Sequence, residues 1–218
     1  MKVALCLSGQ IRSHKLVEDS VNKYLMEPYN PDVFCHFWHK YDNQKYKNFY
    51  NENCTYDYGN YDNKKIQEVI KCYNPNSLKF SSPFYNENTR SMLYSIYESN
   101  KLRVEYEKNM HIEYDVVIKS RYDILFQKKI EIDEVEDKTI YLINRPGGCG
   151  GYGDWIIYGN SKTMDFYMNC YLEYKNTQRI LQPCPEGIWK EYIDSNNYRI
   201  KYIEKCFNIV REDGFLII

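Results

Sequence analysis

The chain has 218 residues, with 29 Lys or Arg against 30 Asp or Glu, which leaves a formal charge of −1. Because there is no basic excess, binding to a nucleic-acid backbone is excluded as the main activity. The length suits one domain with a buried core, so residues 1–218 are assigned to a single domain. No apolar segment is long enough to cross a bilayer, and we expect no membrane span.

Cysteine and tyrosine usage adds two expectations. The eight Cys include no C-x-x-C pair, and several stand inside apolar runs, which favours buried thiols in a reducing compartment. The apolar run at the N-terminus is too short for a signal peptide, so a soluble, cytoplasmic protein is expected. The 24 Tyr suit a sugar-binding surface, since rings stack on sugars, but a biased AT-rich genome produces the same excess.

Apolar runs and helical spacing alternate along the chain. Ser13 is expected to cap the first helix, in which Leu16 and Val17 face inward, and Pro28 and Pro31 are expected to end it. Residues 43–62 show no clean period and are expected to form a long surface excursion. The predicted strands are 2–7, 32–38, 77–80, 114–119, 139–143, 154–159 and 198–203. The predicted helices are 13–25, 64–72, 88–109, 160–171 and 186–194.

This alternation predicts an α/β fold, in which a mainly parallel mixed sheet carries helices on both faces. In such a Rossmann-like sheet, ligands bind at the carboxyl ends of the strands. The polar residues that follow the predicted strands are therefore the candidates for a functional site.

The first of these strand ends is Ser8-Gly9-Gln10-Ile11-Arg12. Backbone N–H groups at the start of the following helix favour anions, and Gly9 permits close approach of a ligand. The segment is neither G-x-G-x-x-G nor a P-loop, and an ordinary strand-to-helix turn explains it equally well. We expect Ser8, Gly9, Gln10 and Arg12 to contact a nucleotide.

The second strand end is Arg121-Tyr122-Asp123, which follows the apolar strand 114–119. One carboxylate can hold a divalent cation through oxygen, and that cation can carry a diphosphate. The alternative is an ion pair between Arg121 and Asp123 that merely caps the strand. Strands one and four of such a sheet can be neighbours, so this strand end and the first one could face one site.

Three further candidates are weaker. The glycine-rich loop 147–153 precedes Asp154, which suits a mobile segment delivering an acid or base, or alternatively a wide hairpin loop with Asp154 as a turn residue. Glu186 follows Pro185, as is ordinary at a helix start, with contact to an acceptor as the alternative. His36 and His39 cannot share one face of a strand, so a metal pair is not expected, although either can touch a ligand.

Taken together, several stretches resemble small glycosyltransferases with the GT-A fold, found among large DNA viruses and bacteria. The similar stretches keep their order over nearly the whole chain, and the set is more specific than any member. They are VALCLSGQIR (residues 3–12), PDVFCHFW (31–38), SMLYSIY (91–97), YDVVIKSRYD (114–123) and GDWIIYGNS (153–161).

The resemblance implies a GT-A-like glycosyltransferase that moves a sugar from a UDP- or GDP-sugar donor to a saccharide acceptor hydroxyl. It implies donor binding at Ser8, Gly9, Gln10, Arg12, Arg121 and Asp123, with Mn²⁺ or Mg²⁺ at an Asp-x-Asp motif. Here Arg121 replaces the first Asp, so Asp123 alone is the expected metal ligand, and Arg121 could itself neutralise the diphosphate. Asp154 is expected on the acceptor side, as general base in an inverting mechanism or as a positioning residue in a retaining one.

Two other functions stay open. A nucleotidyltransferase that forms sugar nucleotides shares the sheet topology but usually carries a glycine-rich first turn with Arg and Lys. A non-catalytic glycan-binding or structural protein also fits the tyrosine content.

Overall fold

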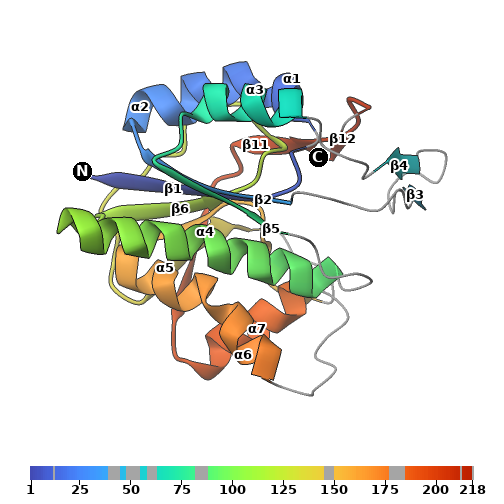
Figure 1. Cartoon of the computed structure of the whole chain (residues 1–218). Helices are drawn as coiled ribbons and strands as arrows, with labels where there is room; N and C mark the ends of the chain where they lie inside the picture. Colours follow the sequence, from blue (N-terminus) through green and yellow to red (C-terminus); the bar gives the residue numbers. More distant parts are fainter. Residues whose placement is uncertain are drawn as a thin grey trace.

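The protein is seen here in a computed structural model, which describes residues 1–11, 13–38, 45–47, 55–57, 63–81, 88–144, 150–176, 185–211 and 213–217. A seven-stranded mixed sheet forms the middle layer, and helices cover both of its faces (Figure 1). The predicted α/β, Rossmann-like fold class is confirmed.

The order of strands in this sheet places the first strand at its centre. The strands are, in spatial order, Arg199–Ile203 (β10), Thr139–Ile143 (β8), Ile157–Gly159 (β9), Val116–Ser120 (β6), Val3–Gly9 (β1), Asp32–Trp38 (β2) and Ser77–Ser81 (β5). β1 runs parallel to both β2 and β6. β9 alone is reversed, being antiparallel to β6 and to β8. The predicted neighbourhood of the first and fourth major strands is therefore confirmed.

The helices divide between the two faces of the sheet (Figure 1). One face carries His14–Val21 (α1), which continues through the π-helical turn Asn22–Met26 into Glu27–Tyr29 (α2), and Asn63–Tyr73 (α3). The other face carries Asn88–Met110 (α4), Ser161–Met168 (α5), Cys170–Asn176 (α6) and Pro185–Ser195 (α7). The helices predicted around residues 64–72, 88–109 and 186–194 are confirmed.

Two apolar clusters lie on opposite faces of the sheet, because successive strand side chains point to opposite sides. Along β1, Leu5 and Leu7 join the cluster under α1 and α3, whereas Ala4 and Cys6 join the cluster under α4. A strand buried on both faces is mainly apolar, which is why β1 and β2 read as largely apolar runs, with the buried Ser8 and His36 as polar exceptions.

Two small sheets accompany the main one. Ile124–Phe126 (β7) pairs antiparallel with Phe207–Val210 (β11), which pairs with Leu216–Ile217 (β12); β11 and β12 were not predicted. Lys45–Lys47 (β3) pairs with Thr55–Asp57 (β4) within the predicted excursion. The remaining residues of 43–62 lie outside the described residues.

Three details of the first helix differ from the prediction. Ser13 does not cap α1, because its buried hydroxyl donates to the backbone oxygen of Val210 at 2.6 Å. Leu16 is 52% exposed, since His14, Val17 and Val21 form the buried stripe of α1. Pro28 lies inside the helical segment and follows its π-helical turn, and the segment ends at Tyr29, between Pro28 and Pro31.

A buried arginine ties α4 to α5. The guanidinium of Arg103 has no exposed surface, and it donates to Asn100 Oδ1 at 2.9 Å and to Ser161 Oγ at 2.6 Å. It also pairs with the carboxylates of Glu107 and Asp165. Because a buried charge is tolerated only when it is paired and hydrogen-bonded, this network fixes the start of α5 against α4.

Candidate functional site at the carboxyl ends of β1 and β6

The chain reverses its direction of travel across the sheet between β1 and β6. It proceeds from β1 to β2 and β5 on one side, and then returns to β6 on the other side of β1. In open α/β sheets, a ligand binds at the carboxyl ends of the strands at such a switch point. The residues after β1 and β6 are the two strand ends that the sequence analysis selected.

At the end of β1 the turn is built from Ser8, Gly9 and Gln10. Ser8 is buried, and Gly9 has a φ of +107°, a conformation that residues with a side chain rarely adopt. The Gly9 N–H donates to Ser95 Oγ on α4 at 3.0 Å. The buried Oε1 of Gln10 has no hydrogen-bond partner among the described residues. Arg12, the fourth predicted contact of this turn, lies outside the described residues.

At the end of β6 Arg121 and Asp123 form a two-pronged ion pair. Arg121 Nε donates to Asp123 Oδ1 at 2.8 Å, and Arg121 Nη2 donates to Asp123 Oδ2 at 2.7 Å. The Asp123 side chain is only 2% exposed. The ion pair considered as the alternative at this strand end is thus present, and it lies at the switch point beside β1.

A second arginine, Arg211, contacts the same carboxylate from the end of β11. Arg211 Nη1 lies 3.3 Å from Asp123 Oδ2, and the N–H of Val210 donates to the backbone oxygen of Asp123 at 2.9 Å. The sequence analysis missed Arg211, although it follows an apolar run just as Arg121 does. Two guanidinium groups therefore contact one carboxylate at this strand end.

The described residues do not offer a ready metal site at Asp123. Both of its carboxylate oxygens accept hydrogen bonds from guanidinium groups, and a divalent cation would have to displace them. Across the described ranges, no group of three or more His, Cys, Asp or Glu is arranged to hold a metal ion. The metal role of Asp123 stays a prediction, and no step is derived through a metal.

Lys119 occupies a position that the sequence analysis did not single out. It lies in the otherwise apolar strand β6, is 1% exposed, and donates from Nζ to the backbone oxygen of Asp154. Burial lowers the pKa of Lys119 to about 8, opposed by the nearby carboxylate of Asp154. The charge of Arg121 also lowers that pKa, whereas the charges of Asp123 and Glu186 raise it. The sequence feature that could have identified Lys119 is its position inside an otherwise apolar strand.

Asp154 reaches this edge because β9 is reversed. Ile157, the first residue of β9, pairs with Lys119 near the carboxyl end of β6, and Asp154 precedes it by three residues. Asp154 is 3% exposed. Of the glycines predicted to form a loop before it, Gly147 and Gly148 lie outside the described residues.

Gly151 packs the segment before Asp154 against the start of α7. A Cβ atom at residue 151 would lie 2.1 Å from the carbonyl carbon and oxygen of Glu186, so only glycine fits. The N–H of Tyr152 donates to the same oxygen at 3.2 Å. The structure thereby brings Glu186, treated in the sequence as a helix start, to the side of the site that holds Asp154.

Two buried aromatic residues adjoin this acidic side. Tyr167 on α5 and Trp189 on α7 stack with ring centroids 5.2 Å apart. Burial raises the pKa of the Tyr167 phenol, and the charge of Asp154 raises it further. Tyr167 OH and Trp189 Nε1 find no hydrogen-bond partner among the described residues. Unpaired polar atoms of this kind are uncommon in folded proteins and mark positions where a water or ligand atom fits.

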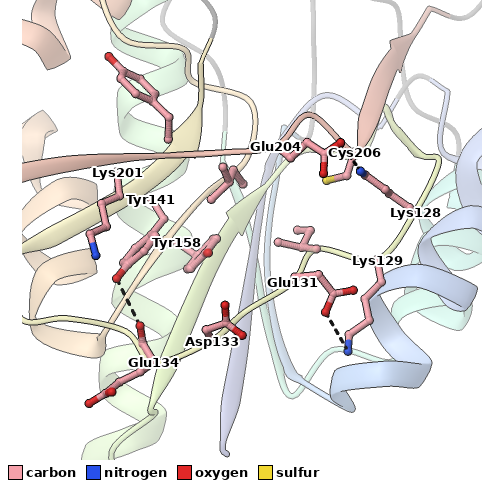
Figure 2. Close-up of a pocket in the computed structure, with 13 residues that line it drawn as sticks. Lys128, Lys129, Glu131, Asp133, Glu134, Tyr141, Tyr158, Lys201, Glu204 and Cys206 are labelled. Carbon is pink, nitrogen blue, oxygen red and sulfur yellow. Dashed lines mark hydrogen bonds and ion pairs between the residues drawn. The ribbon is translucent and has the colours of Figure 1, made fainter.

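A separate hollow of about 480 Å³ lies on the sheet face formed by β8, β9 and β10 (Figure 2). Tyr141 and Tyr158 stack in its floor with ring centroids 4.7 Å apart. Two ion pairs join residues of its lining, Lys128 with Glu204 at 2.6 Å and Lys129 with Glu131 at 3.8 Å. These residues are distinct from the candidate site residues at β1 and β6.

Two findings apply to the chain as a whole. In the part of the chain that the structure describes, no helix combines the length and apolarity that crossing a membrane requires. Comparison of the sequence with protein-family models and with curated proteins found no match.

Proposed function

We propose that the protein transfers a sugar from a nucleoside-diphosphate-sugar donor to an acceptor hydroxyl, with the diphosphate bound near Arg121 and Arg211. The observation that carries this proposal is the pair of guanidinium groups on one carboxylate, Asp123, at the switch point between β1 and β6. The resemblance to small GT-A-fold glycosyltransferases found in the sequence points to the same chemistry.

The leaving group of such a transfer is a nucleoside diphosphate, on which negative charge grows as the glycosidic bond breaks. Positive groups held in place before the reaction stabilise this charge without reorganising. Arginine suits the task because its planar fork matches phosphate oxygens and stays charged at any working pH. In this proposal Asp123 orients the two arginines through its hydrogen bonds to both guanidinium groups.

The acceptor would bind on the side of the site that holds Asp154 and Glu186. A carboxylate there can accept the proton of the attacking hydroxyl if the reaction inverts, or position the acceptor if the configuration is retained. The ammonium group of Lys119, bonded to the backbone of Asp154, supports the segment that carries this carboxylate. Tyr167 lies close enough to Asp154 for its charge to raise the pKa of the phenol, and the ring of Tyr167 stacks on Trp189.

A reducing, cytoplasmic compartment is part of the proposal. The described cysteines Cys6, Cys35, Cys72, Cys170 and Cys206 are all free thiols. Burial raises the pKa of Cys6 and of Cys35 to about 12, so these thiols stay protonated and unreactive.

Calorimetric titration with UDP, GDP, dTDP and CMP tests donor binding, each in the presence of EDTA and then of Mn²⁺. We expect one nucleoside diphosphate to bind in EDTA, and Arg211→Gln to weaken that binding at least tenfold, roughly the effect of losing one charged hydrogen bond. Arg199→Gln is the matched control, because Arg199 lies on the exposed strand β10 with 64% of its side chain exposed.

Transfer itself is tested by incubating the corresponding sugar nucleotide with saccharide acceptors and detecting the product by mass spectrometry. Binding of none of the four nucleotides under either condition contradicts the proposal. Binding of glycans alone would support a non-catalytic glycan-binding protein instead.

A further inference from the structure

His36, near the carboxyl end of β2, is linked to the turn after β1 through one hydroxyl group. Its side chain is fully buried, and Nδ1 lies 2.7 Å from Ser95 Oγ on α4. The N–H of Gly9 donates to the same Ser95 oxygen at 3.0 Å. A chain of hydrogen bonds therefore connects β2, α4 and the β1 turn of the candidate site.

This chain of hydrogen bonds provides a partner for Nδ1 of His36 in one tautomer of the ring. Burial lowers the pKa of His36 to about 4, so the imidazole is neutral at neutral pH and has a single N–H. Ser95 Oγ accepts from Gly9 and still has its own hydrogen to donate. In the tautomer in which Ser95 donates this hydrogen to Nδ1, the imidazole proton is on Nε2.

The Nε2 atom of His36 is buried and has no hydrogen-bond partner among the described residues. The rings of Trp38 and Tyr94 stand edge-on to the imidazole, with centroids at 4.9 Å and 5.8 Å. These two rings and Ser95 hold the orientation of the imidazole. An oriented, unpaired donor in an apolar setting is suited to a neutral acceptor oxygen.

We propose that His36 is a donor-binding residue that hydrogen-bonds, through Nε2–H, a neutral oxygen of the nucleoside part of the nucleotide. The inference rests on the proposed function and assigns the nucleoside to the β2 side of the site. β2 and β6 flank β1, so His36 and Arg121 lie on opposite sides of the central strand. Strands are about 4.8 Å apart, and a nucleoside diphosphate is long enough to extend from one to the other.

The neutral state of His36 favours the nucleoside over the diphosphate. A phosphate group is best met by charged donors, and Arg121 and Arg211 supply these at the other side of β1. Base carbonyls and ribose hydroxyls are neutral acceptors, and both satisfy the chemistry of Nε2–H.

Nuclear magnetic resonance on protein labelled with ¹⁵N-histidine tests this inference without any variant. We expect His36 to show the Nε2–H tautomer at neutral pH, and its Nε2 resonance to shift when UDP, GDP or dTDP binds. Inorganic pyrophosphate should leave the resonance unchanged. If the Nε2 resonance of His36 does not shift when a nucleoside diphosphate binds, the inference is overturned.

Calorimetry with His36→Phe and His36→Gln gives a second measurement. Phe fills the site without a donor, so the affinity for the nucleoside diphosphate should fall about tenfold while pyrophosphate affinity is kept. Gln supplies an N–H donor and should recover part of the loss. Comparison of UDP with CDP, and of UDP with its 2′-deoxy form, distinguishes a base carbonyl from a ribose hydroxyl.

The outcomes separate this inference from the proposed function. Equal affinity of wild type and His36→Phe for the nucleoside diphosphate overturns the role of His36 but leaves the proposed transfer standing. If wild type binds neither a nucleoside diphosphate nor pyrophosphate, both the role of His36 and the proposed sugar transfer are overturned.

Discussion

Asp123 and Arg211 meet across 88 residues of chain, with Arg211 Nη1 at 3.3 Å from Asp123 Oδ2. This contact joins β11 to the end of β6, and Val210 reinforces it by donating its N–H to the backbone oxygen of Asp123. The contact therefore serves two purposes, since it closes the small sheet onto the main one and holds a guanidinium at the candidate site.

Replacing Asp123 by Ala should destabilise the fold, because it leaves a buried guanidinium without its carboxylate. We expect the free energy of unfolding in urea to fall by about 3–5 kcal/mol. The double variant Asp123→Leu, Arg211→Met should recover most of that loss while failing to bind UDP or GDP. Glu105→Gln, in an exposed pair with Lys101, is the control and should change stability by less than about 1 kcal/mol. An Asp123→Ala variant as stable as wild type would show that the pair is dispensable.

Lys119 should make stability depend on alkaline pH. Burial lowers its pKa from 10.5 to about 8, so between these values the unfolded chain holds a proton that the folded protein has released. The free energy of unfolding contributed by Lys119 therefore rises with pH across this window, by about 3 kcal/mol in total at about 1.4 kcal/mol per unit. Below about pH 8 both states are protonated and the contribution is constant.

The measurement is urea unfolding of wild type and Lys119→Met at about pH 7 and about pH 10. The free energy of unfolding of wild type minus that of Lys119→Met should be larger at the higher pH. Taking this difference cancels the titration of all other groups. A difference that is the same at both pH values would show that Lys119 does not titrate in this window.

Gly151→Ala should displace the segment that carries Asp154. The new methyl group would meet the backbone of Glu186, and we expect a loss of about 1–3 kcal/mol together with weaker acceptor use. Gly150→Asn is the control, because Gly150 has a φ of +69° with open space around it, a conformation that Asn tolerates. Thermal unfolding and transfer kinetics on both variants test the difference. A Gly151→Ala protein with wild-type kinetics would mean that this close packing does not position Asp154.

Arg103→Met should separate stability from ligand binding. It removes the guanidinium that joins α4 to α5 and leaves the carboxylates of Glu107 and Asp165 without their partner. We expect unfolding to become easier by about 3–5 kcal/mol, with unchanged affinity of the folded protein for UDP or GDP. A large change in affinity would instead place Arg103 among the residues on which binding depends.

The sequence predicted the main sheet well, because its strands depend on local patterns. β2 and β8 have the predicted bounds, since each is a mainly apolar segment that begins at a polar residue and is followed by one. β11 was missed because Phe207–Val210 is short and gains its place only by pairing with β7, far away in the sequence. Local patterns carry no information about such pairing.

The candidate site was predicted in part for the same reason. Gly9, Gln10, Arg121 and Asp123 follow strands of the main sheet, so their common edge could be inferred from topology alone. The sequence left open whether Asp123 is paired, and the structure answers this with Arg211, which comes from β11. Glu186 joins the site through backbone packing against Gly151, which no local motif encodes.

Because β9 runs in the reverse direction, the residues before it can vary without changing the rest of the sheet. Residues that precede β9 arrive at the same rim as residues that follow β1 and β6. Insertions or deletions ahead of Asp154 can therefore remodel what the rim accepts, while the pairing of the seven strands and the arginine pair stay as they are.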